Sequence, residues 1–180
     1  GSIWSWNRPI YDPTSGGHLR IELRALPAGP TPADMLATAA FSAGLIEGLS
    51  DQINTILPGI PFRYAEHNFY RTAKDGLNAR LFWPNFDANS IEERPVPDIL
   101  EELMPVAETG LKHLGVADEE IKTYLGIANN TLISRQNGAI WQLETLRRLE
   151  QKKDRSTALR GLVQRYRGNY LEGTPVHLWR

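Results

Sequence analysis

Residues His18 to Arg24 alternate polar and apolar side chains at the two-residue period of a β-strand. The alternation predicts a strand whose apolar face, formed by Leu19, Ile21 and Leu23, packs on a core. The other face carries His18, Arg20, Glu22 and Arg24. An acid flanked by cations suits a sheet face that lines an anionic, metal-assisted site. The alternative is a solvated outer face, because antiparallel sheets commonly leave one face in water.

A long helix is predicted to follow this strand. Thr31-Pro32-Ala33-Asp34 supplies a hydroxyl N-cap, a proline at the first helical position and an acid near the positive helix end. Apolar residues then recur every three or four positions: Leu36, Ala39, Ala40, Ala43, Ile46, Leu49, Ile53 and Ile56. This spacing predicts an amphipathic helix of about six turns that buries the stripe and ends before Pro58.

The remainder of the chain is predominantly helical in pattern. Ala79 to Trp83 is predicted to be extended and closed by Pro84, and residues 85–97 form a turn-rich connector. Helices are predicted over residues 64–77, 99–114, 118–126, 139–151 and 156–170, with Pro105 kinking the second. The fold class is therefore α+β, with few antiparallel strands near the N-terminus. Residues 1–180 form one domain or a C-terminal fragment, divided into a strand-and-helix part (1–84) and a helical part (85–180).

Composition limits the chemistry of this 180-residue chain. It contains no cysteine, which excludes disulfides, thiolate zinc sites and cysteine nucleophiles. No apolar run approaches the roughly 20 residues that span a bilayer. The first residues have neither the basic region nor the apolar core of a signal peptide. A soluble protein of the cytoplasm, without a membrane partner, is expected.

The net charge of −1 conceals an asymmetry along the chain. Residues 87–120 contain ten acids against two basic residues, and residues 147–167 contain eight basic residues against two acids. We interpret these as solvated faces that attract one another. No aromatic residue interleaves the basic run before Tyr166, so no nucleic-acid partner is predicted. In the alternative hypothesis the chain is a non-catalytic helical interaction module, and the two charged regions are its partner surface.

Three patches of residues resemble the second half of the bacterial glutamate–cysteine ligases, most closely the branch of carboxylate–amine ligases. The first patch comprises Ile3-Trp4, Arg8-Pro9, Gly17, Leu19 to Arg24, Pro30-Thr31, Asp34 and Ala39-Ala40. The second comprises Asn68, Ala73, Lys74, Gly76-Leu77 and Ala79, and the third Gly138-Ala139 with Gln142. The likeness covers roughly the first 80 residues.

This resemblance implies a fold similar to glutamine synthetase, in which a curved antiparallel sheet holds metal ions and ATP and is backed by helices. The implied reaction forms an amide: ATP phosphorylates a carboxylate, and an amine displaces the phosphate. The implied cofactors are ATP and Mg²⁺. The implied partners are amino-acid-like carboxylate and amine substrates and an N-terminal half of the same polypeptide. Exposed sheet edges also favour a homo-oligomer.

The resemblance also implies roles for five residues. Glu22 is the expected magnesium ligand, and Arg24 the catalytic cation that holds phosphate or the substrate carboxylate, because a guanidinium contacts two oxygens at once. Arg8, Asn68 and Lys74 are expected to bind substrate or nucleotide. The structural alternatives are an ion pair of Glu22 with Arg20 or Arg24, surface arginines, and an N-cap or buried polar tie for Asn68.

The chain departs from the family pattern at several positions. His18 replaces a threonine, His67 an acid, Phe69 and Tyr70 an arginine and a tryptophan, and Lys74 an arginine. Lys74 keeps the charge but lacks the planar fork of arginine. His18 is predicted to be a hydrogen-bonded structural residue, and the five tryptophans are predicted to be core or interface anchors.

Overall fold

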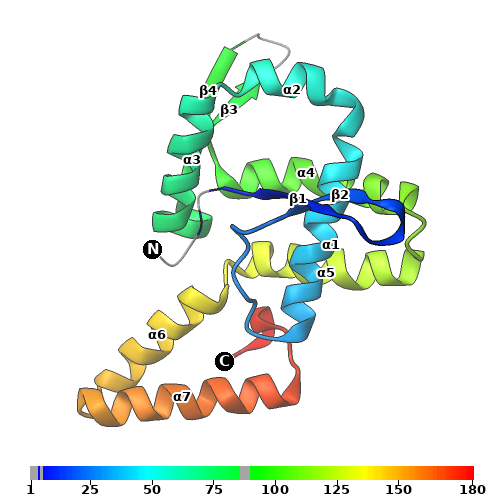
Figure 1. Ribbon diagram of the computed structural model, residues 1–180. Helices are drawn as coiled ribbons and strands as arrows, with labels where there is room; N and C mark the ends of the chain where they lie inside the picture. The colour runs from blue at the N-terminus through cyan, green and yellow to red at the C-terminus, as the bar shows by residue number, and fades with distance from the viewer. Residues whose placement is uncertain (1–3, 5, 86–89) are drawn as a thin grey trace.

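The chain folds into helices and two separate antiparallel hairpins in the computed structural model, which describes residues 4, 6–85 and 90–180 (Figure 1). The strands are β1 (Arg8–Asp12), β2 (His18–Glu22), β3 (Arg80–Asn85) and β4 (Ser90–Pro95). The helices are α1 (Pro32–Gly48), α2 (Ile53–Gly59), α3 (Phe62–Asp75), α4 (Val96–His113), α5 (Asp118–Ser134), α6 (Gly138–Glu150) and α7 (Arg155–Glu172). The predicted α+β class and helical remainder are confirmed.

Helix α1 begins where the sequence predicts, with a complete capping box. The Asp34 backbone N–H donates to Thr31 Oγ1 at 3.3 Å, and the Thr31 backbone N–H donates to Asp34 Oδ2 at 3.1 Å. The predicted continuous six-turn helix is wrong. A 3₁₀ turn at Ser50–Gln52 separates α1 from α2, which continues through Pro58 to Gly59. Ser50 Oγ donates to the Glu47 carbonyl, which offers the backbone a local alternative to the helical ladder.

Helix α1 meets α4 through small residues. A Cβ placed on Gly44, Gly48 or Gly110 would overlap the backbone of the facing helix, so glycine permits the close approach of α1 and α4. The large apolar residues of the predicted stripe lie on the other side, and Leu36, Ile46 and Ile53 are exposed. The prediction that they are buried is wrong for these three, because the contact between two closely packed helices admits only small side chains.

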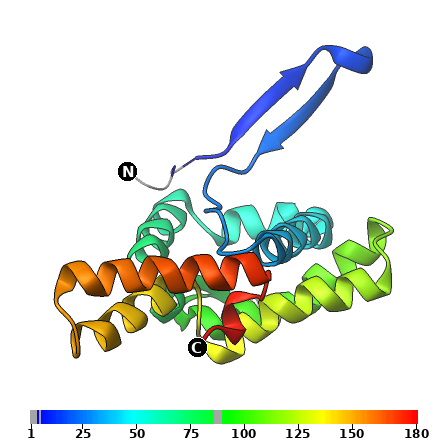
Figure 2. The ribbon, with the colours of Figure 1, turned by 90° about the horizontal axis from the view of Figure 1, so that it is seen from below.

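Two clusters form the core. Ala107, Leu111, Ile121 and Leu125 lie between α4 and α5 and contact Phe41 and Leu45 of α1. The second cluster joins Trp141 of α6 to Trp179 after α7, with ring centroids 4.9 Å apart and nearly perpendicular planes. This cluster anchors the arm formed by α6 and α7 (Figures 1 and 2). Trp141 and Trp179 are therefore core residues, as predicted.

The hairpin β3–β4 corrects two predictions. Residues 90–95, expected to be a connector, form β4 and pair with β3 in the register Arg80↔Pro95. Pro84 lies inside β3, opposite Ile91, rather than closing the strand. Residues 86–89 between the two strands lie outside the described part of the chain. Helix α3 packs on β3, and Phe82 contacts Tyr64 with ring centroids 4.8 Å apart.

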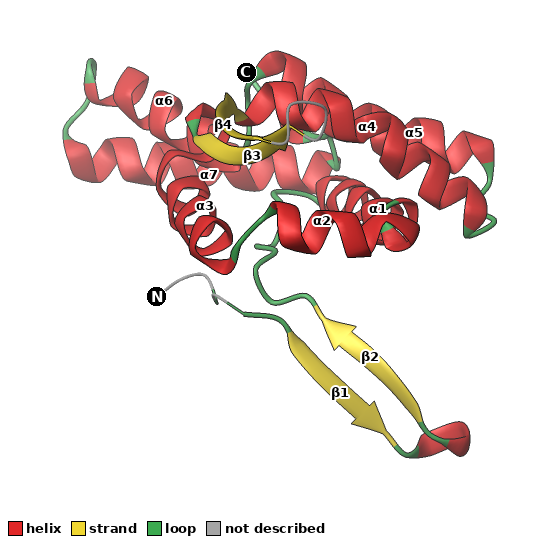
Figure 3. Ribbon diagram, turned by 90° about the horizontal axis from the view of Figure 1, so that it is seen from above, coloured by secondary structure: helices red, strands yellow, loops and turns green. Residues whose placement is uncertain are grey.

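The hairpin β1–β2 extends away from the helices (Figures 2 and 3). Its register pairs Pro9 with Ile21 and Tyr11 with Leu19, so these four residues share one face. Leu19 is 78% exposed and Ile21 61% exposed, and Leu23 beyond the strand is also exposed. The predicted burial of this face is wrong in the structure described here, because no described helix covers the apolar side of β2.

Helix α5 is longer than predicted. It continues past Gly126 to Ser134 and ends at Arg135 in the left-handed conformation. None of the described helices combines the length and the hydropathy needed to cross a membrane.

Candidate functional site

Glu22 lies between two arginines on the polar face of β1–β2. The register places Arg8 opposite Glu22, and Arg8 Nη2 lies 2.7 Å from Glu22 Oε2. Arg24 Nε lies 3.6 Å from Glu22 Oε1 on the other side. Glu22 Oε2 is itself buried and accepts no hydrogen bond from the described residues, so its contact with Arg8 is an ion pair rather than a directed hydrogen bond. Three of the five predicted site residues therefore come together.

Two tryptophan rings contact the guanidinium of Arg24. Its guanidinium carbon lies 4.4 Å from the ring centroid of Trp4 and 4.6 Å from that of Trp6. Trp4 and Trp6 are about half-exposed, so of the two predicted roles they are not core residues, while a role as interface anchors stays a prediction. A cation–π contact places the cation over an aromatic face. The planes of Trp4 and Trp6 are 86° apart, so the planar guanidinium of Arg24 can lie flat on at most one of the two rings.

A second ion pair occupies the far end of the same face. Arg20 Nη1 lies 2.7 Å from Asp12 Oδ2, so Arg20 does not pair with Glu22. Hydrogen bonds from Thr14, followed by that from Arg20, lower the pKa of the Asp12 carboxyl to about 2. His18 Nε2 lies 3.3 Å from Arg20 Nη1, in agreement with a structural role.

The polar face therefore has an excess of positive charge. Arg8, Arg20 and Arg24 oppose Asp12 and Glu22, which leaves a formal charge of 3 − 2 = +1 with His18 neutral. A surface of this sign attracts anions such as phosphate or carboxylate.

Asn68 and Lys74 lie on α3, apart from the Glu22 group. Asn68 Nδ2 donates to the Phe82 carbonyl and Asn68 Oδ1 accepts from the Phe82 N–H, both at 2.8 Å. The buried amide thus acts as a polar tie to β3, one of the structural alternatives, while ligand binding by Asn68 stays a prediction. Lys74 lines an open hollow of about 550 Å³ with Arg63, Glu66, His67, Tyr70 and Arg71. No hydrogen bond or ion pair between described residues joins either to Glu22.

The described residues do not by themselves form a metal site. No group of three or more His, Asp or Glu side chains among them is arranged to hold an ion. Glu22 offers carboxylate oxygens, which Mg²⁺ prefers, but both oxygens face guanidinium groups. Among the described residues, Glu22 thus has no second acidic or histidine side chain beside it with which to enclose an ion, and its role as a magnesium ligand stays a prediction.

The acidic and basic regions form no direct ion pair with each other among the described residues, and their predicted attraction stays a prediction. Arg94 pairs with Glu102, Lys112 with Glu108 and Arg155 with Glu150, and no described ion pair joins residues 90–120 to residues 147–167. Asp87 of the acidic region lies outside the described residues. All eight basic side chains of the α6–α7 arm are exposed.

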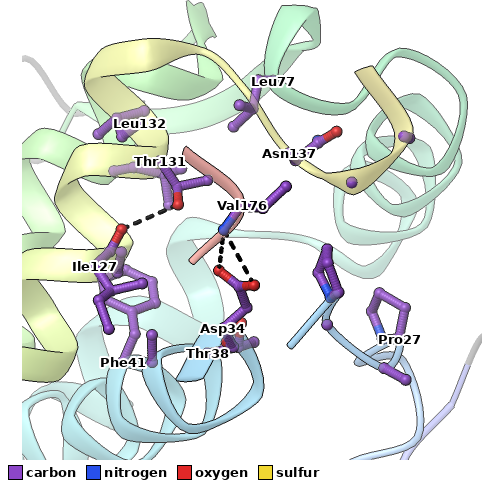
Figure 4. Close-up of a pocket in the computed structure, with 18 of the residues that line it drawn as sticks. Pro27, Asp34, Thr38, Phe41, Leu77, Ile127, Thr131, Leu132, Asn137 and Val176 are labelled. Atoms are coloured by element: carbon purple, nitrogen blue, oxygen red, sulfur yellow. Dashed lines mark hydrogen bonds between the residues drawn. The ribbon is translucent and has the colours of Figure 1, made fainter. Parts of the chain in front are cut away.

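A cavity that the sequence did not reveal lies at the N-terminal end of α1 (Figure 4). Asp34, predicted only as an acid at a helix start, reaches across to the C-terminal segment and accepts the Val176 N–H at 3.1 Å. The lining also includes Pro30, Leu77, Gly138, Ala139 and Gln142 from the three family-like patches. Those patches did not indicate a cavity, because they lie far apart in the chain.

Comparisons with known proteins give no assignment. No family model, no curated protein and no solved structure matches this chain.

Proposed function

We propose that this chain is the C-terminal portion of an ATP-dependent carboxylate–amine ligase with a fold similar to glutamine synthetase. The observation that carries the proposal is the Arg8–Glu22–Arg24 group on one face of β1–β2. All three side chains belong to the residues that carry the family resemblance. A carboxylate between two arginines is the combination of residue types that phosphoryl transfer to a carboxylate needs.

The uncovered surface of β1–β2 also supports the proposal. A two-stranded hairpin is at best marginally stable in water by itself, and this one exposes Tyr11, Leu19 and Ile21. Further strands of a larger sheet would pair with the free edges, and helices that back such a sheet would cover the apolar face. The N-terminal half of the ligase is the partner that we propose for this role.

The chain's own residues would act on anionic groups. Arg24, whose guanidinium contacts Trp4 and Trp6, would hold the transferring phosphate or the substrate carboxylate, because a guanidinium can contact two oxygens at once. Arg8 would neutralise the same anion from the opposite strand. Held in place before the reaction, such cations stabilise the charge that develops during the transfer.

Glu22 would be one magnesium ligand, with the remaining ligands supplied by the phosphates, water and the N-terminal half. The bound ion would neutralise phosphate charge. Asn68 and Lys74 remain proposed binding residues, Asn68 through its hold on β3 and Lys74 through its position in the α3 hollow.

The test is ADP release by the full polypeptide, as its cells make it, with amino-acid carboxylates and amines as substrates. Glu22→Gln and Arg24→Lys should each lower kcat by about a hundredfold or more, because each removes a charge or a fork used in the transition state. Asp12→Asn, on the same face and outside the group, is the matched control. Unchanged turnover in Glu22→Gln, with the fold intact by circular dichroism, contradicts the proposal.

A second candidate is a non-catalytic helical interaction module. The observation that favours it is the α6–α7 arm, whose eight basic side chains are exposed and form no ion pair with the described residues of the acidic region. Arg160→Glu with Arg165→Glu should then abolish capture of an acidic partner, whereas Glu22→Gln should be silent. The ligase proposal requires that Glu22→Gln lowers turnover and that Arg160→Glu with Arg165→Glu leaves it unchanged.

A further inference from the structure

The cavity of Figure 4 has a volume of about 480 Å³, within the range of pockets that bind small molecules. Its walls come from the Pro27–Pro30 loop, α1, α4, α5, the start of α6, Tyr166 of α7 and Val176. Segments from both ends of the chain therefore enclose one space.

The lining side chains are mostly apolar, among them Phe41, Leu100, Met104, Ile127 and Leu132. No lysine, arginine or histidine belongs to the described lining. An anionic ligand would therefore meet no countercharge there and would lose its hydration without compensation.

A cationic ligand also has no vacant partner. Asp34 is the only carboxylate of the lining, and it accepts from the Thr31 N–H, the Thr31 hydroxyl and the Val176 N–H. These bonds cap α1 and hold the C-terminal segment, so a cation at Asp34 would compete with bonds that the fold uses.

A few polar atoms remain to orient a neutral molecule. Thr131 Oγ1 donates to the Ile127 carbonyl at 3.0 Å, which leaves its lone pairs able to accept (Figure 4). Burial, followed by the charge of Asp34, raises the pKa of the Tyr166 hydroxyl, which keeps it protonated as a donor. Asn137 Oδ1 accepts the Ile140 N–H, and its amide NH₂ is a further donor.

We propose that this cavity binds a small, uncharged, largely apolar molecule with one or two hydrogen-bonding groups. The site is separate from the anion-attracting face of β1–β2, so it does not depend on the proposed ligase function. Because the Pro27–Pro30 loop that follows β2 forms one wall, the ligand also fixes the connection between the hairpin and α1.

The first experiment titrates the chain with N-phenyl-1-naphthylamine, an uncharged apolar probe whose fluorescence rises on burial. Saturable binding of one probe per chain is expected. Methyl NMR reports its position, because the chain has two methionines: Met104 lines the cavity, whereas Met35 is exposed and does not. The Met104 methyl signal should shift and that of Met35 should stay.

Three variants, one of them a control, test the location further. Thr38→Phe, at an exposed position of the lining, should weaken probe binding at least tenfold, and Ala39→Phe, exposed and outside the lining, should change it less than twofold. Ala128→Phe fills the cavity from α5 and should act like Thr38→Phe. Absence of saturable binding, an unshifted Met104 signal, or equal loss in Ala39→Phe overturns the proposal.

Discussion

The two hairpins have the same number of strands but differ in what covers them. Hairpin β3–β4 has α3 against it, Phe82 in contact with Tyr64, and the Asn68 amide bonded to its backbone. Hairpin β1–β2 has Tyr11, Leu19 and Ile21 in water, and its strongest described side-chain contacts are ion pairs. Exposed ion pairs contribute little to stability. The difference shows that the candidate catalytic residues stand on the less supported of the two hairpins.

Hydrogen exchange should separate the hairpins most strongly. Backbone amides of β1–β2 should exchange at least about a hundredfold faster than those of β3–β4, because the first opens locally and the second opens with its packed helix. Native-state exchange followed by NMR measures both in one sample. Equal protection would show that β1–β2 is stabilised by contacts other than those described.

Removing the bonds between Asn68 and Phe82 should make β3–β4 less stable and so reduce the difference between the two hairpins. Asn68→Ala leaves both the Phe82 N–H and its carbonyl without a partner, so the free energy of unfolding should fall by about 2–4 kcal/mol. Asn54→Ala, at an exposed helical position, is the control. Urea unfolding measures both, and a loss below about 0.5 kcal/mol would mean that the tie contributes little.

Removing apolar side chains should affect the two hairpins unequally. Leu19→Thr with Ile21→Thr should change the unfolding free energy of the chain by less than about 0.5 kcal/mol, because both residues are exposed. Phe82→Ala on β3 should cost about 2 kcal/mol, less than a fully buried phenylalanine because Phe82 is half-buried.

The same pair of substitutions sharpens the ligase proposal. In the full polypeptide β1–β2 is proposed to join a larger sheet. There, Leu19→Thr with Ile21→Thr should lower the free energy of unfolding several times more than in the chain alone. Equal effects in both would mean that nothing covers this face.

The smallest expected effect is the response of the β1–β2 hairpin to low pH. The Asp12 carboxyl should titrate with a pKa of about 2, below its ordinary 3.8, because Thr14 and Arg20 hydrogen-bond its charged form. A lowered folded pKa means that the contribution of Asp12 is present above pH 3.8 and is lost as the pH falls toward 2. Carboxyl NMR follows this titration, and Asp12→Asn should remove the local response at the β1–β2 turn without changing β3–β4.

The sequence predicted correctly those features of the fold that depend on interactions between residues close together in the chain. The capping pattern at Thr31 located the start of α1, and the alternation at His18–Glu22 located β2. Strand β4 was missed because its sequence contains Pro95 and three charged residues, and only pairing with β3 and cover from neighbouring helices make it a strand. Three residues of the α1 stripe, Leu36, Ile46 and Ile53, were wrongly predicted to be buried, because Gly44, Gly48 and Gly110 signal a close helix contact only once both helices are in place.

The candidate sites likewise combine features that the sequence determined with features that only the tertiary structure decided. The sequence determined that Glu22 and Arg24 share a strand face, since the period of a β-strand fixes it. It also determined where most helices lie and which chemistry the absence of cysteine excludes. Only the tertiary structure placed Arg8 opposite Glu22, tied Asn68 to Phe82, brought Trp4 and Trp6 to Arg24, and enclosed the cavity beside Asp34. These arrangements depend on packing between segments far apart in the chain, and no local pattern of residues encodes such distances.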